Sequence, residues 1–217
     1  MKKKLTMKQV TKLCLLVTAM LSSLVFTSCL KDGDDTIVLP LPDGKIPTSI
    51  IPQNLQDSLT SNGFVINEGI NPPNIEGVYL ASPLSLQYAS DGYNNLFYDL
   101  TMTFKDQKAR GLITYSERQR DTVEGNSISA QVIGEDSNFT MYCYQYISEY
   151  SGATQLWKCK IATVVSGIKT AKGFRNCQYS YIMLEKEAIS DYYYNMLTNV
   201  ETFRIYYDGD KLATKIR

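Results

Sequence analysis

Residues 139–165 read FTMYCYQYISEYSGATQLWKCKIATVV, a stretch that indicates two β-strands joined by a tight turn at Ser151-Gly152. Side chains of different character alternate on each side of this turn, and a strand places alternate side chains on opposite faces of a sheet. A turn centred on Ser151 pairs residues whose numbers sum to 302, so Cys143 faces Cys159 and Met141 faces Ile161. The expected core face of this hairpin carries Phe139, Met141, Cys143, Gln145, Ile147, Trp157, Cys159 and Ile161.

The opposite face of the hairpin is rich in tyrosine. Tyr142, Tyr144 and Tyr146 lie on it, set across from Lys160, Lys158 and Leu156. Aromatic rings offer an apolar surface together with a polar group, and they attract cations. This pattern predicts a binding surface for a glycan or a partner, with candidate residues Tyr142, Tyr144, Tyr146 and Trp157. Two alternatives stay open: a helix covers the stripe, or the stripe is an exposed face that only favours β structure.

Outward from the hairpin, the chain continues as short strand-like segments separated by turn signals such as Asp91-Gly92, Lys172-Gly173 and Asp208-Gly209. Many short strands at regular spacing are typical of an antiparallel sandwich or barrel. We therefore expect an all-β, mainly antiparallel fold, with a barrel preferred to a sandwich. The expected strand segments begin at Ile75 and continue as 96–104, 111–115, 127–133, 139–147, 156–165, 177–184 and 202–207.

Two segments have helical spacing instead. Ile51, Leu55 and Leu59 recur every fourth residue, with Pro52 at the start and Gly63 after the end, so residues 52–62 are expected to form a short helix. Late in the chain, apolar residues follow helical spacing and Ser190 or Asp191 can cap the start. This second helix is expected to lay an apolar stripe against the sheet, formed by Ile189, Tyr192, Tyr193, Met196 and Leu197.

The N-terminus has the order of an export signal. Residues 1–12 are basic, and an apolar stretch from Leu13 to Phe26 is shorter than the roughly 20 residues that span a bilayer. The run Phe26-Thr27-Ser28-Cys29 resembles the lipobox of bacterial lipoproteins, in which the cysteine receives a diacylglycerol and the preceding bond is cut. The resemblance implies a signal peptide of residues 1–28 and a lipid on Cys29 that binds the protein to the membrane.

The residues that follow Cys29 resemble the export segment of surface lipoproteins of the Bacteroidota type. They read Leu30-Lys31-Asp32-Gly33-Asp34-Asp35, and in that family such an acidic run directs a lipoprotein to the outer face of the outer membrane. Prolines in residues 29–48 indicate a semi-rigid tether. We therefore expect a tether over 29–48, a β domain over 49–217, and a location at the cell surface.

A second resemblance concerns the β domain. Gly77-Val78-Tyr79, which opens the first long strand after a short helix, is similar to the Gly-x-Trp opening of lipocalin-like barrels. Such barrels place an arginine from the last strands across that ring, and Arg204 matches it in position. The resemblance implies a lipocalin-like barrel in preference to a sandwich.

Three cysteines remain in the β domain, so at least one of them is unpaired within the chain. The expected register permits a disulfide between Cys143 and Cys159, and an exported protein meets oxidising conditions. Buried, unreactive thiols are the alternative that we favour. The spacing of the cysteines is not a zinc pattern, and no metal or cofactor is expected.

Composition excludes several functions. The chain has no histidine, which removes the commonest general acid or base and the commonest metal ligand. Five of its 22 basic residues lie in the signal, so the mature chain carries 17 basic and 22 acidic residues, a net charge of 17 − 22 = −5. An acidic protein lacks the basic surface that nucleic acid requires. Acids that a paired-carboxylate hydrolase could use, Glu76, Asp99, Glu117 and Asp121, show no sign of convergence.

The sequence therefore predicts a non-enzymatic lipoprotein that binds a small-molecule, hydrophobic or glycan ligand at the cell surface. The alternative is an accessory subunit that contacts another protein in an outer-membrane assembly.

Mass spectrometry of the protein taken from its native membrane tests the anchor. We expect an N-terminal peptide that starts at a lipid-modified Cys29, and we expect protease to shave the domain from intact cells. An unmodified N-terminus cut elsewhere would identify an ordinary secretory signal instead.

Overall fold

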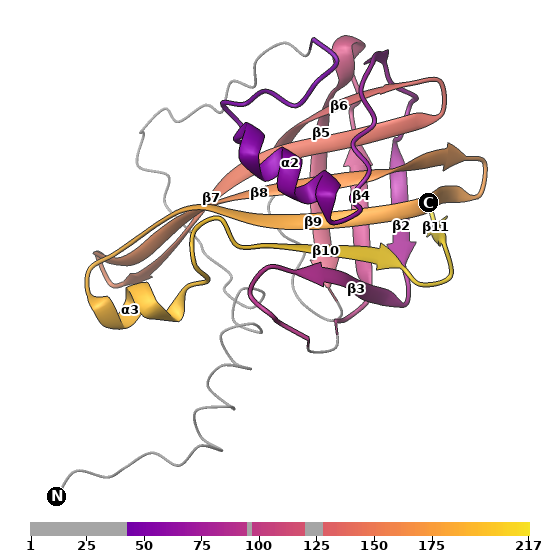
Figure 1. Ribbon diagram of the computed structural model, residues 1–217. Coiled ribbons are helices and arrows are strands. Elements are labelled where there is room, and N and C mark those ends of the chain that lie inside the picture. The colour runs from indigo at the N-terminus through magenta and orange to yellow at the C-terminus, as the bar shows by residue number, and fades with distance from the viewer. Residues whose placement is uncertain (1–42, 95–96, 120–127) are drawn as a thin grey trace, which may run out of the picture.

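The computed structural model of the protein describes residues 43–94, 97–119 and 128–217 (Figure 1). Cys29, the expected signal peptide and most of the expected tether lie outside these residues. The described elements are α2 (Gln53–Ser61), β1 (Ile70–Asn71), β2 (Gly77–Ala81), β3 (Leu84–Ala89), β4 (Leu100–Lys105), the 3-10 turn η1 (Ala109–Gly111), β5 (Leu112–Gln119), β6 (Ile128–Glu135), β7 (Asn138–Ser151), β8 (Thr154–Thr170), β9 (Gly173–Ala188), α3 (Asp191–Met196), β10 (Phe203–Asp208) and β11 (Leu212–Lys215).

All eleven strands belong to one sheet whose pairings run round into a ring. Antiparallel pairs connect β2, β4, β5, β6, β7, β8 and β9 in that order. The last strand, β11, pairs with both β2 and β9 and so joins the two ends. The middle of β9 pairs with β10, which in turn pairs with β3, and β1 adds a parallel pair with β6. The expected all-β, mainly antiparallel fold with one early and one late helix is confirmed, and it is a single sheet rather than a sandwich of two.

The hairpin of β7 and β8 has the expected faces but a different register. Its turn is Gly152-Ala153, and Cys143 pairs with Thr163 while Cys159 pairs with Ile147. The shift of four residues is even, so each side chain keeps the face that alternation predicted. Gly152 has a φ of +61°, as the first central residue of a type II′ turn requires. A bulge opposite Glu149 and Tyr150 leaves one residue of β8 without a partner in β7 and shifts the register by one.

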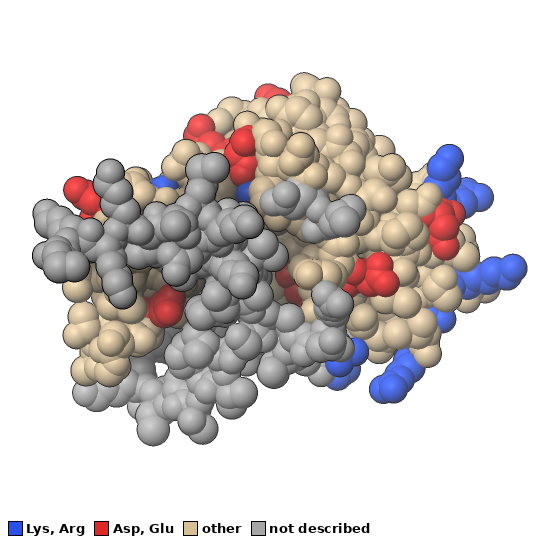
Figure 2. All heavy atoms as spheres, turned by 90° about the horizontal axis from the view of Figure 1, so that it is seen from below, with Lys and Arg blue, Asp and Glu red and all other residues tan. Residues whose placement is uncertain are grey.

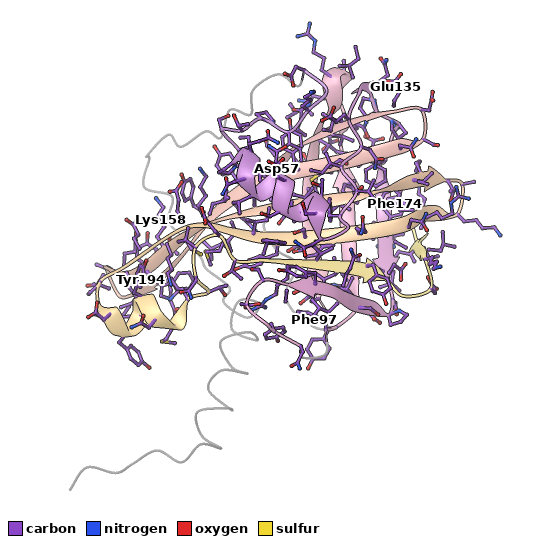
Figure 3. All side chains as sticks on the ribbon, in the orientation of Figure 1. Asp57, Phe97, Glu135, Lys158, Phe174 and Tyr194 are labelled. Carbon is purple, nitrogen blue, oxygen red and sulfur yellow. The ribbon has the colours of Figure 1, made fainter. Side chains whose placement is uncertain are left out.

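Aromatic side chains fill one end of the ring. Tyr79 stacks on Phe174 with ring centroids 3.7 Å apart, and Phe104 and Phe139 pack edge-on or tilted against Phe174. All four are buried, and Figure 3 shows Phe174 among the strands of the ring. Large buried rings of this kind supply much of the hydrophobic free energy of a core.

The ring of Tyr79 does not have the arginine that the lipocalin resemblance implies. Lys169 donates a hydrogen bond to the Tyr79 hydroxyl at 2.9 Å and lies 5.1 Å from the ring centroid. Arg204 instead lies 3.9 Å from the ring of Tyr93 and forms an ion pair with Asp91 at 2.6 Å. The expected contact between Arg204 and Tyr79 is therefore wrong.

Helix α2 and the residues before it cover the outer face of the sheet. Pro52 precedes the helix and Gly63 follows it with a φ of +85°, as the sequence predicts. Leu55 and Leu59 are buried against strands β6 to β10, together with Ile46, Ile50 and Ile51. In Figure 1 α2 crosses in front of β8 and β9. Packing onto the sheet thus includes Ile46, three residues before the expected start of the domain.

The late helix exists and contacts β9 and β8, but the sheet covers its expected apolar stripe only in part. Helix α3 spans Asp191–Met196 and none of its residues is buried, although Tyr193 and the following Leu197 are half-buried. Tyr192 and Met196 are exposed, as is Ile189 just before the helix. No helix in the described residues is both long enough and apolar enough to cross a membrane.

Closure of the ring by β11 predicts that an alanine destabilises the protein more at Gly173 than at Gly152. Gly173 has a φ of +147°, and a Cβ there would lie 2.1 Å from the Ala213 carbonyl oxygen of β11. Gly173→Ala should therefore cost at least about 2 kcal/mol of unfolding free energy, because strand β11 must move. Gly152→Ala is the matched control: its φ is also positive, but nothing lies within 4 Å of the new Cβ, so it should cost only about 1 kcal/mol. Guanidinium denaturation measures both, and equal losses would contradict the close approach of β11 to Gly173.

Candidate functional site

Tyr142, the first residue of the predicted binding surface, is inside the protein. Its side chain is 0% exposed and lies in the apolar layer beneath α2 and the residues before it. Its hydroxyl is buried without a hydrogen-bond partner, and burial raises the pKa of that hydroxyl. Tyr142 is therefore a packing residue that no ligand can reach in this structure.

Tyr144 and Tyr146 lie farther along β7 and are accessible in part. Tyr146 is 43% exposed, whereas Tyr144 is half-buried at the edge of the layer under α2. The Nζ atom of Lys158 lies 4.4 Å from the Tyr146 ring centroid, and that of Lys160 lies 4.7 Å from the Tyr144 centroid. Lys160 also forms an ion pair with Glu185 at 3.2 Å. Each ring thus already has a lysine against it, which a stacking sugar would have to displace.

Trp157 lies on the other face of the sheet. Its side chain packs beside Cys159 and Ile161, and its Nε1 donates a hydrogen bond to Glu149 Oε2 at 2.6 Å. The four predicted binding residues therefore do not form one surface: one is buried, two share the outer face, and one lies on the inner face.

Strands β7, β8 and β9 extend past the ring and form a projecting arm, which we define as residues 145–160 and 184–201. Figure 1 shows the ends of these strands and α3 reaching away from the region that α2 covers, and Figure 3 places Lys158 and Tyr194 there. The arm carries many exposed large apolar or aromatic side chains: Tyr146, Tyr150, Ile189, Tyr192, Tyr194, Met196 and Val200. Clustered exposure of this kind marks interaction surfaces in soluble proteins.

Lys186 of β9 fastens α3 to the arm. Its Nζ donates to the backbone carbonyls of Tyr194 and Leu197 at 3.2 and 3.3 Å and to the Asn199 side chain at 3.1 Å. The same atom lies 4.1 Å from the Tyr194 ring centroid. A lysine that binds the last carbonyls of a helix also complements the helix dipole. Polar contacts therefore hold α3 in place while its apolar side chains remain exposed.

The three cysteines of the described residues form no disulfide. Cys143, Cys159 and Cys177 are free and buried, and the observed register puts Cys143 opposite Thr163 rather than Cys159. Burial raises the pKa of all three thiols, that of Cys159 to about 11. The predicted Cys143 to Cys159 pairing is wrong because the turn is centred one and a half residues past Ser151, which moves the register by three, and the bulge between Glu149 and Tyr150 adds one more.

Two of the acids considered for a hydrolase, Glu117 and Glu76, are engaged in other hydrogen bonds. Both carboxylate oxygens of Glu117 accept hydrogen bonds, from the Tyr115 hydroxyl at 2.6 Å and the Tyr179 hydroxyl at 3.1 Å. Burial raises the pKa of Glu117, while these two bonds act in the opposite direction. Glu76 accepts a bond from the Gln107 backbone N–H at 2.8 Å, and Asp121 lies outside the described residues. Among the described residues no group of three or more acidic or cysteine side chains could hold a metal ion.

A pocket that the sequence did not predict lies at the seam between β9, β10 and β11. We call it the seam pocket; its walls include Val65, Cys177, Gln178, Tyr207, Asp208 and Lys211. Asp208 is 2% exposed, and neither of its carboxylate oxygens has a hydrogen-bond partner. The sequence Asp208-Gly209 indicated only a turn. Strand alternation was the missed signal, because it puts Asp208 on the same inner face as the buried Tyr206.

No protein-family model, curated protein or solved structure matches this chain.

The buried hydroxyl of Tyr142 gives a test of its structural role. Tyr142→Phe should leave the unfolding free energy unchanged or raise it by up to about 1 kcal/mol, because a buried hydroxyl without a partner costs stability. Tyr146→Phe, at an exposed position, should change it by less than about 0.5 kcal/mol. Thermal denaturation measures both, and a large loss for Tyr142→Phe would reveal a bond to that hydroxyl.

Proposed function

We propose that this protein is a lipid-anchored, non-catalytic lipoprotein at the outer-membrane surface that binds a second envelope protein through its arm. The observation that carries the proposal is the concentration of exposed aromatic and aliphatic side chains on the arm and on α3, none of whose residues is buried. The lipobox-like run ending at Cys29 and the acidic residues after it support the anchor and the location.

The arm has the composition of an interface centre. Tyrosine and methionine are enriched at the centres of protein interfaces, where a few such side chains supply most of the binding free energy. Tyr150, Tyr192, Tyr194 and Met196 are all exposed on the arm. Their backbone is ordered by long strand pairs and by the Lys186 contacts, so a partner would lose little entropy in fixing them.

The charges of the arm indicate how a partner binds. Lys158, Lys160 and Lys186 lie among five acids of the arm, Glu149, Glu185, Glu187, Asp191 and Glu201, which gives a net charge of 3 − 5 = −2. With charges of both signs close together and a small net charge, the arm has only a weak field to attract a partner from a distance. The partner we propose is therefore a protein with an apolar surface patch, and its affinity should depend only weakly on salt.

The glycan function has weaker support on this face. The rings of Tyr144 and Tyr146 already contact lysines, and Trp157 lies on the opposite side of the sheet. A non-catalytic role is supported by the absence of histidine from the sequence and by the two tyrosine hydroxyls that engage the oxygens of Glu117.

Site-specific photocrosslinking in intact cells tests the proposal. A photoreactive phenylalanine at Tyr192 or at Tyr194 should capture one and the same envelope protein. The control position is Ile216, an exposed residue near the C-terminus, at the other end of the molecule in Figure 1. The double variant Tyr192→Ser, Met196→Ser should reduce co-purification of that protein at least tenfold, in 50 mM as in 300 mM salt, without lowering the melting temperature. Identical capture from Ile216, or none from the arm, would refute the arm as the binding surface.

A further inference from the structure

Two lysines meet at the end of the ring that the aromatic stack fills. Lys169 of β8 pairs with Phe174, and Lys215 of β11 pairs with Tyr79. Paired residues of neighbouring strands put their side chains on the same face of a sheet, so both lysines share the inner face with the stacked rings. Their Nζ atoms lie 5.1 and 5.9 Å from the Tyr79 ring centroid. Two ammonium groups therefore converge on one end of the ring.

A chain of three hydrogen bonds fixes both ammonium groups. Lys169 Nζ donates to the Tyr79 hydroxyl at 2.9 Å, and that hydroxyl donates to the Glu76 backbone carbonyl at 3.1 Å. Lys215 Nζ donates to the same carbonyl at 3.2 Å. Gly77 leaves the space that the Lys215 side chain crosses, because a Cβ there would lie 2.7 Å from its Cε. The fold thus positions both lysines.

Neither ammonium group has a negative partner in the part of the chain that the structure describes. None of the ion pairs found there involves Lys169 or Lys215. Burial raises the pKa of the Tyr79 hydroxyl to about 12, so this group is neutral. Glu76 places its own carboxylate on the Gln107 backbone N–H at 2.8 Å. Burial, and next the charge of Lys215, lower the pKa of Lys169, as expected for two like charges that no anion neutralises.

The surface around the two lysines is basic. Figure 2 shows Lys and Arg side chains projecting at the right-hand side, where Figure 1 places the β8–β9 turn and the C-terminus. Asp210 before β11 and Glu135 and Asp136 in the β6–β7 turn are acids of neighbouring turns. The exposed basic residues near the pair are Lys172, Arg175, Lys211 and Arg217. Basic side chains gathered on an acidic protein attract anions to this end.

The unused donors indicate the charge and shape of the anion. An ammonium group has three N–H donors. Lys169 uses two of them, on the Tyr79 hydroxyl and the Thr170 carbonyl, and Lys215 uses one. Lys169 is half-buried and Lys215 is exposed, so a ligand can reach both from solvent. A phosphate monoester matches the three remaining donors, because it carries nearly two negative charges and three strong acceptor oxygens.

We propose that Lys169 and Lys215 bind the phosphate group of a phosphate monoester at this end of the ring. The site lies at the opposite end of β8 from the arm and does not depend on the proposed function of the arm. A soluble phosphate ester and a lipid headgroup can both carry this group.

NMR titration of the mature chain, residues 29–217 with Cys29→Ser, tests the site at constant ionic strength. Glycerol 3-phosphate and inorganic phosphate should give saturable shifts of the backbone amides of Val78, Lys169, Thr170 and Lys215. Their small size limits the dissociation constant to roughly the millimolar range. Acetate, with a single charge, should bind at least about tenfold more weakly. No saturable shift with either phosphate, or equal affinity for acetate, would overturn the proposal.

Variants separate a defined site from general attraction by the basic surface. Lys169→Gln and Lys215→Gln should each weaken glycerol 3-phosphate binding at least about fivefold, since each removes charge-assisted hydrogen bonds. Lys215 is exposed, so its variant should keep the wild-type melting temperature. The matched control is Lys172→Gln, which removes the same charge from the adjacent turn, where the Lys172 carbonyl accepts from the Lys215 backbone at 2.8 Å. It should change binding less than about twofold, and equal losses in all three variants would overturn the site.

Vesicles separate the two sources of the phosphate group. Phosphatidic acid carries a phosphate monoester, whereas phosphatidylcholine does not. Sedimentation of the wild type with phosphatidic acid alone, lost in the double variant Lys169→Gln, Lys215→Gln, would assign the phosphate to a lipid headgroup. Binding of glycerol 3-phosphate without sedimentation would assign it to a soluble ester. Both results support the site, whereas equal sedimentation of wild type and double variant, with no response to glycerol 3-phosphate, would overturn it.

Discussion

The four residues of β11 hold the sheet closed, and the rest of the structure depends on that closure. This strand pairs with β2 on one side and with the start of β9 on the other. It can approach β9 so closely only because Gly173 has no side chain in the way of the Ala213 carbonyl. Closure turns the apolar faces of β2, β4, β5, β7 and β9 toward one another, and the stack of Tyr79, Phe104 and Phe174 fills the space between them. An open sheet would leave these rings in water, at a cost of about 25 cal/mol for each Å² exposed.

Unequal strand lengths produce both the arm and the seam from the same sheet. Strands β7, β8 and β9 have 14, 17 and 16 residues, whereas β2, β4 and β11 have 5, 6 and 4. The ring uses only part of each long strand, so their far ends project as the arm. The N-terminal end of β9 extends beyond the residues that pair with β10. Strand β11 pairs with this end instead, and a seam lies between β10 and β11. Backbone hydrogen bonds are satisfied along the arm, but its side chains have no second layer to cover them.

Alternation along each strand was predictable from sequence, and pairing between strands was not. The faces of Phe139, Met141 and Tyr142 follow from a period of two, whatever the register is. The register depends on the turn: the sequence predicts a turn centred on Ser151, whereas the chain turns at Gly152-Ala153 and adds a bulge. Helix α3 forms at its predicted place because spacing and capping are local properties. Its exposure depends on which other segments lie near the end of the arm in the folded chain, and a local sequence pattern does not determine that. The burial of Tyr142 depends on α2, whose apolar side chains are 80 to 90 residues away in the sequence.

The arm and the seam differ in what they cost the folded protein. Exposed apolar side chains on the arm cost little, because much of any protein surface is apolar. The unpaired Asp208 has a real cost, since a carboxylate that prefers its proton up to about pH 6 is destabilised by its surroundings at neutral pH. The folded chain holds this proton more tightly than the unfolded chain does, so the contribution of Asp208 to stability falls as pH rises from about 4 to about 6. Because Asp208 precedes the turn into β11, this cost arises beside the strand that closes the ring.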